Sequence, residues 1–258
     1  MYRRLLERVL IVPAVLLVSA AKPAAKPPGP PTPRPTTRPA DYPTSEYTAR
    51  QIEGWKVHVH TELLTSQKKL GDKALKLLTT KLYDINRVVP PKALADLHKI
   101  PIWISVKDRV GRHPCACYHP SREWLKANRY NPDKAGSVDI LNARTFYDWT
   151  TFSQPSMVLH ELAHGYHHRF LEGGYGNKEL QAAYKRMVAG KKYESVLYFT
   201  GKKRRAYGLN NPQEYFAELT EAFYGTNDFY PFVRAEIMTH DPEMYKLLRK
   251  LWREERRR

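Results

Sequence analysis

The stretch His160-Glu161-Leu162-Ala163-His164 constrains this chain more than any other part of it. Residues four apart on an α-helix lie on one face, so these two imidazoles can share one zinc ion at about 2.0–2.1 Å each. The glutamate between them lies at the edge of that face and can reach a zinc-bound water without binding the metal. The pattern predicts one zinc ion on His160 and His164, with Glu161 as the general base of a peptide-bond hydrolase.

The residues around this stretch predict the helix that the pattern needs. Pro155 suits the first turn of a helix, and Gly173-Gly174 offers an end. Between them, apolar residues recur at the spacing of one helical face: Leu159, Leu162, Ala163, Tyr166 and Phe170. His167 and His168 follow on the same helix, and we expect them at the rim of the site, next to the metal ligands or in solvent, not on the metal.

A catalytic zinc needs three protein ligands, and the third is predicted downstream of the motif. Residues 211–223 are typical of a second helix, with Asn211 as the N-cap and Pro212 at the first helical position. Glu214 and Glu218 are four apart and share a face, so one can bind zinc while the other holds a ligand histidine by its second ring nitrogen. We predict Glu214 as the ligand and Glu218 as the partner of the histidine. The alternative for Glu214 is a capping box with Asn211.

Tyr207 precedes Glu214 by seven residues, and a phenol there can donate a hydrogen bond to the oxyanion of a tetrahedral intermediate. The alternative is an ordinary half-buried tyrosine, one of 17 in the chain. The HELAH stretch, the Tyr–Glu spacing and Glu-Tyr-Phe-Ala-Glu at 214–218 together resemble the catalytic domain of the anthrax lethal factor family and its secreted Pro-Pro endopeptidase relatives. The resemblance covers residues 137–225.

That resemblance implies a zincin-like metallopeptidase domain of the gluzincin type, with an HExxH active-site helix and a distal glutamate. The residues it implies are the ligands His160, His164 and Glu214, the base Glu161, and the transition-state helper Tyr207. The chain departs from the family in the basic segment before Tyr207 and in its C-terminal segment. The family's preference for proline-containing sequences therefore does not transfer.

Short apolar runs predict a small mixed sheet beside the motif helix, and hence an α+β fold. The strands are expected at residues 54–60, 101–106 and 137–141, with a helix over residues 70–88. In zinc peptidases of this kind, a strand shortly before the motif helix commonly forms the sheet edge beside the cleft. We therefore expect an extended peptide to add there by backbone hydrogen bonds, at Val138, Asp139, Ile140 and Leu141.

The beginning of the chain predicts export. Residues 1–20 are typical of a secretory signal, because arginines precede a short apolar run and a small-residue cleavage site. Residues 21–45, rich in Ala, Pro and Thr, predict a disordered linker, and residues 46–258 predict the metallopeptidase domain. We expect a secreted or extracytoplasmic protein with no transmembrane span after signal cleavage, or a membrane-tethered one if the signal stays uncleaved.

The net charge is +17, from 43 Lys and Arg against 26 Asp and Glu, and it favours anionic partners. No nucleic-acid-binding motif accompanies the basic residues, so no specific nucleic acid is expected. Three functions remain. They are a secreted zinc endopeptidase with a peptide or protein substrate, a non-catalytic zinc-containing protein that binds an anionic surface or polymer, and a cell-wall amidase. The intact Glu161 favours the first.

Cys115 and Cys117 are the two cysteines of the chain, and one residue separates them. A disulfide that closes so small a ring is strained, and two cysteines alone do not make a zinc site. We expect a disulfide or free thiols that shape a loop near the site. A small second metal site with the flanking His113 and His119 is the alternative.

Overall fold

The computed structural model describes residues 39–113 and 115–254. The predicted signal over residues 1–20 and most of the predicted linker over residues 21–45 lie outside these ranges. None of the helices in the described part of the chain is long and apolar enough to cross a membrane.

Asp41 and Tyr42 fall within the predicted linker but belong to the folded domain. The Asp41 carboxylate pairs with Lys134 Nζ at 2.9 Å, and its side chain is only 4% exposed. Tyr42 is buried, and the Arg109 guanidinium lies 4.9 Å from the centroid of its ring. The domain therefore begins before residue 46. Proline content placed the boundary too late because it carries no information about these two long-range contacts.

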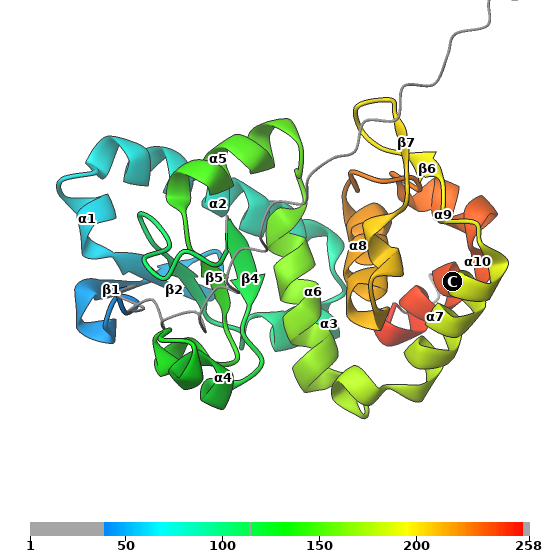
Figure 1. Cartoon of the computed structure of the whole chain (residues 1–258), viewed down its shortest axis with the longest axis horizontal. Coiled ribbons are helices and arrows are strands. Elements are labelled where there is room, and N and C mark those ends of the chain that lie inside the picture. Colours follow the sequence, from blue (N-terminus) through cyan, green and yellow to red (C-terminus); the bar gives the residue numbers. More distant parts are fainter. Residues whose placement is uncertain (1–38, 114, 255–258) are drawn as a thin grey trace, which may run out of the picture. The chain divides into compact units, whose positions relative to one another are not determined.

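A five-stranded mixed sheet occupies the first half of the described chain (Figure 1). Its strands are β1 (Tyr47–Ile52), β2 (Trp55–His60), β3 (Ile102–Ile104), β4 (Ala116–Tyr118) and β5 (Val138–Ile140). They lie in the order β1-β2-β3-β5-β4. The three inner strands are parallel, and the two edge strands are antiparallel to their neighbours. The predicted α+β class and small mixed sheet are confirmed.

Helices flank the sheet and build the second half of the domain. Their bounds are α1 (Thr61–Leu64), α2 (Lys68–Val88), α3 (Pro91–Leu97), α4 (Arg122–Ala127), α5 (Ala143–Phe152), α6 (Met157–Phe170), α7 (Lys178–Gly190), α8 (Pro212–Tyr224), α9 (Arg234–His240) and α10 (Pro242–Leu251). Short 3-10 helices are η1 (Thr44–Glu46), η2 (Pro132–Lys134), η3 (Gly174–Gly176) and η4 (Tyr207–Leu209). A small hairpin joins β6 (Val196–Leu197) and β7 (Lys203–Arg204).

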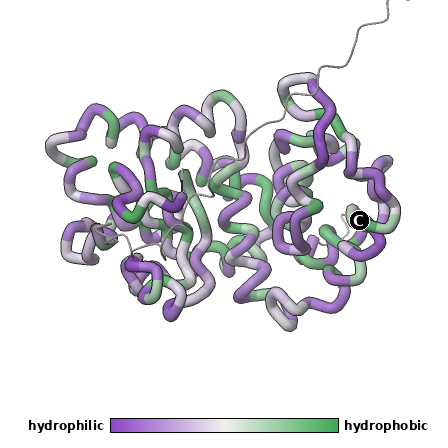
Figure 2. The backbone as a smooth tube through the Cα atoms, viewed as in Figure 1, coloured by the Kyte–Doolittle hydropathy of each residue, from purple (hydrophilic) through white to green (hydrophobic). Residues whose placement is uncertain are grey.

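Helix α6 connects the two halves, because it packs on β4 and β5 on one side and on α8 on the other (Figure 1). Figure 2 shows apolar residues on the central strands, apolar and hydrophilic residues alternating along α6, and hydrophilic residues on many of the outer turns. The core is continuous across α6. Its largest fully buried side chains include Trp55 of β2 and Trp252, which stacks on Tyr166 of α6 with ring centroids 4.2 Å apart.

The structure contradicts the prediction of a substrate-binding sheet edge at Val138, Asp139, Ile140 and Leu141. The first three form β5, which lies between β3 and β4 and pairs with both, and Leu141 follows the end of the strand. All four are buried. The edge on this side is β4, which pairs with β5 alone among the described strands. A strand of three residues is too short to show the alternation by which strands are found in a sequence.

Gly165, the residue after the motif, lets α6 approach the sheet closely. A Cβ at this position would lie 2.7 Å from Ile100 Cδ1 and 3.0 Å from the ring of Tyr118, which ends β4. These distances are shorter than van der Waals contact, so glycine allows a helix–strand approach that a larger residue would prevent. The contact holds the motif helix against the edge strand.

Candidate metal centre and its cleft

Two helices bring the predicted metal ligands together. His160 and His164 lie one turn apart on α6, and Glu214 lies in the first turn of α8. Asn211 is the N-cap of α8, as predicted, and its Oδ1 accepts a hydrogen bond from the Glu214 backbone at 2.8 Å. The Glu214 side chain points to the two histidines and does not form a capping box. The alternative role of Glu214 in a capping box is therefore wrong.

Three atoms of these residues form a nearly equilateral triangle. Glu214 Oε2 lies 3.1 Å from His160 Nε2 and 3.3 Å from His164 Nε2, and the two Nε2 atoms are 3.1 Å apart. Ligands at about 2.0–2.1 Å from a tetrahedral zinc are roughly 3.3–3.4 Å from one another. The triangle therefore has the size that three ligands of one zinc ion require.

The partner of His160 on its other ring nitrogen is Glu221, not the predicted Glu218. Nδ1 of His160 donates to Glu221 Oε1 at 2.6 Å, whereas Glu218 Oε1 is 3.8 Å away. Glu221 lies two turns after Glu214 on α8, so it shares the helix face that points to α6. That spacing of seven residues is the signal in the sequence that could have identified it.

The hydrogen bond from Nδ1 decides what the three converging atoms can do. With the proton of a neutral imidazole on Nδ1, His160 Nε2 presents a lone pair, as a metal ligand must. The lone pair on His160 Nε2 then faces the lone pairs on Glu214 Oε2 and on His164 Nε2, each at 3.1 Å. Such atoms repel one another unless a cation or a proton lies between them. The donor set therefore fits a bound divalent cation.

The pKa shifts within this group of side chains point the same way. Burial works to lower the pKa of His160, but its hydrogen bonds to Glu214 and Glu221 hold that pKa well above the usual value. Burial works to raise the pKa of Glu214, yet hydrogen bonds from His160 and His164 hold it well below the usual value. Both shifts are in the direction that favours positive charge among these three side chains.

The triangle opens on a cleft of about 670 Å³. The predicted base Glu161 and the predicted helper Tyr207 line this cleft, as does the whole of the edge strand β4. Tyr207 lies in η4, which packs on α8, and its side chain is 47% exposed. Burial and the nearby Glu214 carboxylate raise the pKa of Tyr207, so its phenol remains a hydrogen-bond donor at neutral pH.

Three buried acidic residues form one wall of the cleft and are called here the cleft carboxylates: Glu218, Glu221 and Asp228. Burial raises the pKa of Glu218 and of Glu221, and burial with the charge of Glu221 raises the pKa of Asp228 to about 7. Asp228 follows α8 in a loop, and no motif in the sequence marks it.

His167 and His168 contribute nothing to the metal group. His167 was expected at the rim but is fully buried in the core, between the rings of Tyr175 and Phe216. Burial lowers its pKa to about 3, so it is neutral in the folded protein. His168 is half-buried, and its Nδ1 lies 2.9 Å from the Tyr118 hydroxyl.

A second group of buried charges, called here the lysine cluster, consists of Asp41, His119, Lys134 and Asp139. Lys134 Nζ is 2.9 Å from both Asp41 and Asp139, and His119 Nε2 is 3.2 Å from Asp139. Burial works to raise the pKa of Asp139, but the ammonium of Lys134 holds it below the usual value. Asp139, predicted to bind substrate, instead pairs with an internal lysine.

Cys115 and Cys117 are free thiols that line the cleft. Cys115 Sγ donates to Met157 Sδ at 3.2 Å, and Cys117 Sγ lies 3.6 Å from His119 Nε2. Within the described chain, neither cysteine belongs to a group of side chains with the spacing of metal ligands. The alternative of a second metal site with His113 and His119 therefore finds no support.

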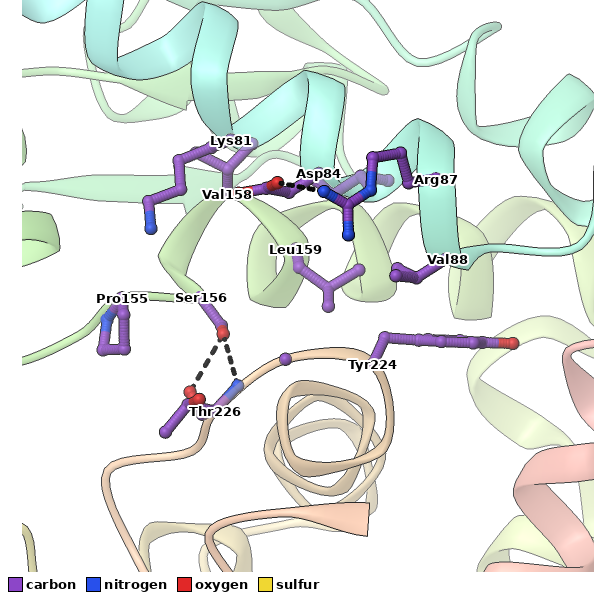
Figure 3. Close-up of a pocket in the computed structure, with 12 residues that line it drawn as sticks. Lys81, Asp84, Arg87, Val88, Pro155, Ser156, Val158, Leu159, Tyr224 and Thr226 are labelled. Atoms are coloured by element: carbon purple, nitrogen blue, oxygen red, sulfur yellow. Dashed lines mark hydrogen bonds and ion pairs between the residues drawn. The ribbon is translucent and has the colours of Figure 1, made fainter.

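Another cavity, of about 250 Å³, lies between α2, the start of α6 and the end of α8 (Figure 3). Ser156 Oγ bridges to the backbone of Thr226 there, and Asp84 pairs with Arg87 at 3.9 Å. None of the predicted site residues lines this cavity. The chemistry-bearing residues are gathered in the larger cleft.

Comparisons with protein-family models, with curated proteins and with solved structures give no match to this chain. The assignment of a function therefore depends on the residues and their geometry.

Proposed function

We propose that this chain is a zinc-dependent endopeptidase with a zincin-like fold, exported from the cytoplasm. The observation that carries the proposal is the triangle of lone pairs from His160, His164 and Glu214, with edges of 3.1–3.3 Å. It is supported by Glu161 and Tyr207, which line the same cleft. A helix–strand packing that needs Gly165 holds this motif beside a free sheet edge.

In this proposal His160, His164 and Glu214 hold the zinc ion. When bound, zinc supplies a Lewis acid and lowers the pKa of a water to roughly 7. Glu161 takes the proton of the attacking water and passes it to the leaving amine. Tyr207 donates its phenolic hydrogen to the oxyanion that forms on the scissile carbonyl. Glu221 keeps the ring of His160 in one orientation and one tautomer.

The substrate backbone is proposed to pair with β4 and not with β5. Of the two edge strands of the described sheet, β1 and β4, only β4 lines the cleft, through its residues Ala116, Cys117 and Tyr118. An extended peptide can add to such an edge by main-chain hydrogen bonds. This places the peptide along the wall opposite α8, with the predicted metal ligands beside it.

The test compares wild type with Glu161→Gln, each assayed for zinc content and for turnover of a mixed peptide library. We expect one zinc ion per chain in both proteins, and a fall in cleavage of at least about 10²–10⁴-fold in the variant, because the base is lost and the ligands are kept. The matched control is Glu172→Gln, an exposed glutamate just after α6, which should cleave as wild type does.

Three results would contradict the proposal. Full cleavage by Glu161→Gln would remove that residue as the base. Zinc binding without any cleavage by wild type would favour the non-catalytic polymer-binding protein or the amidase. The absence of zinc from both proteins would remove the metal centre itself.

A further inference from the structure

The charge of the cleft is opposite to that of the chain. The whole sequence has 43 basic and 26 acidic side chains. Among the described residues that line the cleft, none is Lys or Arg, and the acidic ones are Glu161, Glu214, Glu218, Glu221 and Asp228. The basic surface therefore gives no guide to what enters the cleft.

Two of these five carboxylates have no part in the proposed reaction. Glu161 serves as the base, Glu214 as a ligand, and Glu221 as the partner of His160. Glu218 and Asp228 remain, and they are 4% and 5% exposed. Glu218 Oε2 has no hydrogen-bond partner, and neither residue forms an ion pair with a Lys or Arg of the described chain. A buried carboxylate without such a partner is costly and is stabilised by a cation that approaches it.

Aromatic rings stand next to these two carboxylates on the cleft wall. Tyr198 and Phe229 are joined by a β-bridge, their ring centroids are 4.7 Å apart, and both line the cleft. The Arg204 guanidinium lies 4.6 Å from the centroid of the Tyr198 ring, so of the two rings Phe229 is the one with no cation of the described chain over it. Phe229 directly follows Asp228 in the chain. Aromatic faces attract ammonium and guanidinium groups, most strongly where water is excluded. A carboxylate beside aromatic rings suits a cationic side chain with an apolar stem.

We propose that the cleft binds a peptide with a Lys or Arg side chain near the scissile bond, and that Asp228, together with Glu218, pairs with this cation. This deepens the proposed function and rests on it. Lysine and arginine reach deeply buried acceptors because their charge lies at the end of a long apolar stem. Tyr198 and Phe229 would line the path of that stem. Asp228 would then determine specificity without taking part in the chemistry.

The experiment measures peptide binding, so that it does not depend on turnover. The zinc-loaded full chain with Glu161→Gln is titrated with short random peptide pools in which one position is fixed as lysine or as Nε-acetyl-lysine. We expect the lysine pools to bind about tenfold or more tightly at one position, because acetylation removes the charge and keeps the stem. Adding Asp228→Asn or Glu218→Gln should bring the two pools to nearly equal affinity.

The matched control is Asp148→Asn in the same background. Asp148 is an exposed carboxylate on α5, next to the cleft residue Trp149. The substitution therefore removes one negative charge, as Asp228→Asn does, but from outside the cleft. It should leave the lysine preference unchanged. An equal loss in this control would show a general effect of net charge and overturn the assignment to Asp228.

Other outcomes are also decisive. Equal binding of lysine and acetyl-lysine pools to the parent protein would refute the cationic subsite, even if wild type cleaves peptides. A second zinc ion per chain that is lost on Asp228→Asn would show that these carboxylates hold a metal and not a substrate. A lysine preference without cleavage by wild type would leave the subsite standing and refute the peptidase.

Discussion

The cleft carboxylates and the lysine cluster are both buried and acidic, but they are neutralised in different ways. In the lysine cluster, Lys134 lies within 2.9 Å of Asp41 and Asp139 and is itself fully buried. The cleft carboxylates have no such lysine or arginine among the described residues. The pKa of Asp139 is accordingly lowered by Lys134, while burial raises the pKa of Asp228 to about 7.

This difference separates a structural group of charges from one that is available for binding. Where the chain supplies its own cation, as Lys134 does, the charges of the carboxylates are neutralised on folding, although Asp139 Oδ1 still lacks a hydrogen-bond partner. Where it supplies none, the positive charge must come from a proton, a metal ion or a substrate. Burial and acidity alone do not distinguish the two groups. The presence or absence of an internal lysine does.

The largest expected effect is on the lysine cluster. Lys134→Met keeps the stem but leaves Asp41 and Asp139 buried without their cation, so the free energy of unfolding should fall by about 3–5 kcal/mol. Urea unfolding of the zinc-loaded protein measures it. Lys68→Met is the control, because Lys68 and Asp72 form an exposed pair, and its effect should stay within about 0.5 kcal/mol. Similar losses in both variants would remove the distinction between a buried and an exposed pair.

The next effect concerns the pH dependence of the metal-free protein. The folded pKa of Asp228 is about 7 against an ordinary value of 3.8, so the folded state keeps a proton that the unfolded chain releases. This contribution to stability is complete below pH 3.8 and is lost as the pH rises through 7. Between about pH 5 and pH 7.5, wild type should lose about 2–3 kcal/mol relative to Asp228→Asn, as measured by unfolding at each pH.

Asp139 sharpens this comparison because its pKa is shifted in the other direction. Its contribution is present above the ordinary pKa and is lost as the pH falls through the lowered folded value. The difference in the free energy of unfolding between wild type and Asp139→Asn should therefore be about the same at pH 5 as at pH 7.5. A slope like that of Asp228→Asn would contradict the assignment of Asp139 to a neutralised cluster.

The smallest of these effects is on zinc affinity and concerns Glu221, whose Oε1 accepts a hydrogen bond from His160 Nδ1 at 2.6 Å. Glu221→Gln keeps the shape but weakens the hydrogen bond from Nδ1, so zinc affinity should fall by about 10–100-fold. Competition with a chelator measures it, and Glu172→Gln again serves as the control. Glu218→Gln should have little effect on zinc affinity, because Glu218 lies 3.8 Å from the same nitrogen. If Glu218→Gln had the larger effect, the sequence-based choice of Glu218 would be restored.

The parts of the site that follow helical spacing could be predicted from the sequence. The positions of His160, His164 and Glu214 depend on local geometry within α6 and within the capped first turn of α8. Periodicity also predicts which side of each helix is buried. The same reasoning applies to Glu221, since it lies two turns from Glu214, but Glu218 lies on the same face one turn from Glu214 and spacing alone does not separate the two.

The parts that depend on tertiary contacts could not be predicted. β5 lies inside the sheet because it enters between β3 and β4, which both precede it in the chain, and nothing in the residues of β5 encodes this. Asp139 of β5 was predicted to lie on a substrate-binding edge, but it is buried and pairs with Lys134, a contact that the sequence does not indicate. Asp228 carries no motif, and only its place on the cleft wall distinguishes it from other acidic residues.

The pairing of Asp41 with Lys134 also limits how the chain can be trimmed by proteases. A cut before Asp41 leaves both carboxylates of the lysine cluster in place. A cut just after Asp41 removes one of these carboxylates. It also makes Tyr42, whose side chain is buried, the new N-terminal residue. Any proteolytic trimming that preserves the folded domain would therefore have an inner limit before Asp41, which is set by an ion pair and not by the composition of the segment that precedes it.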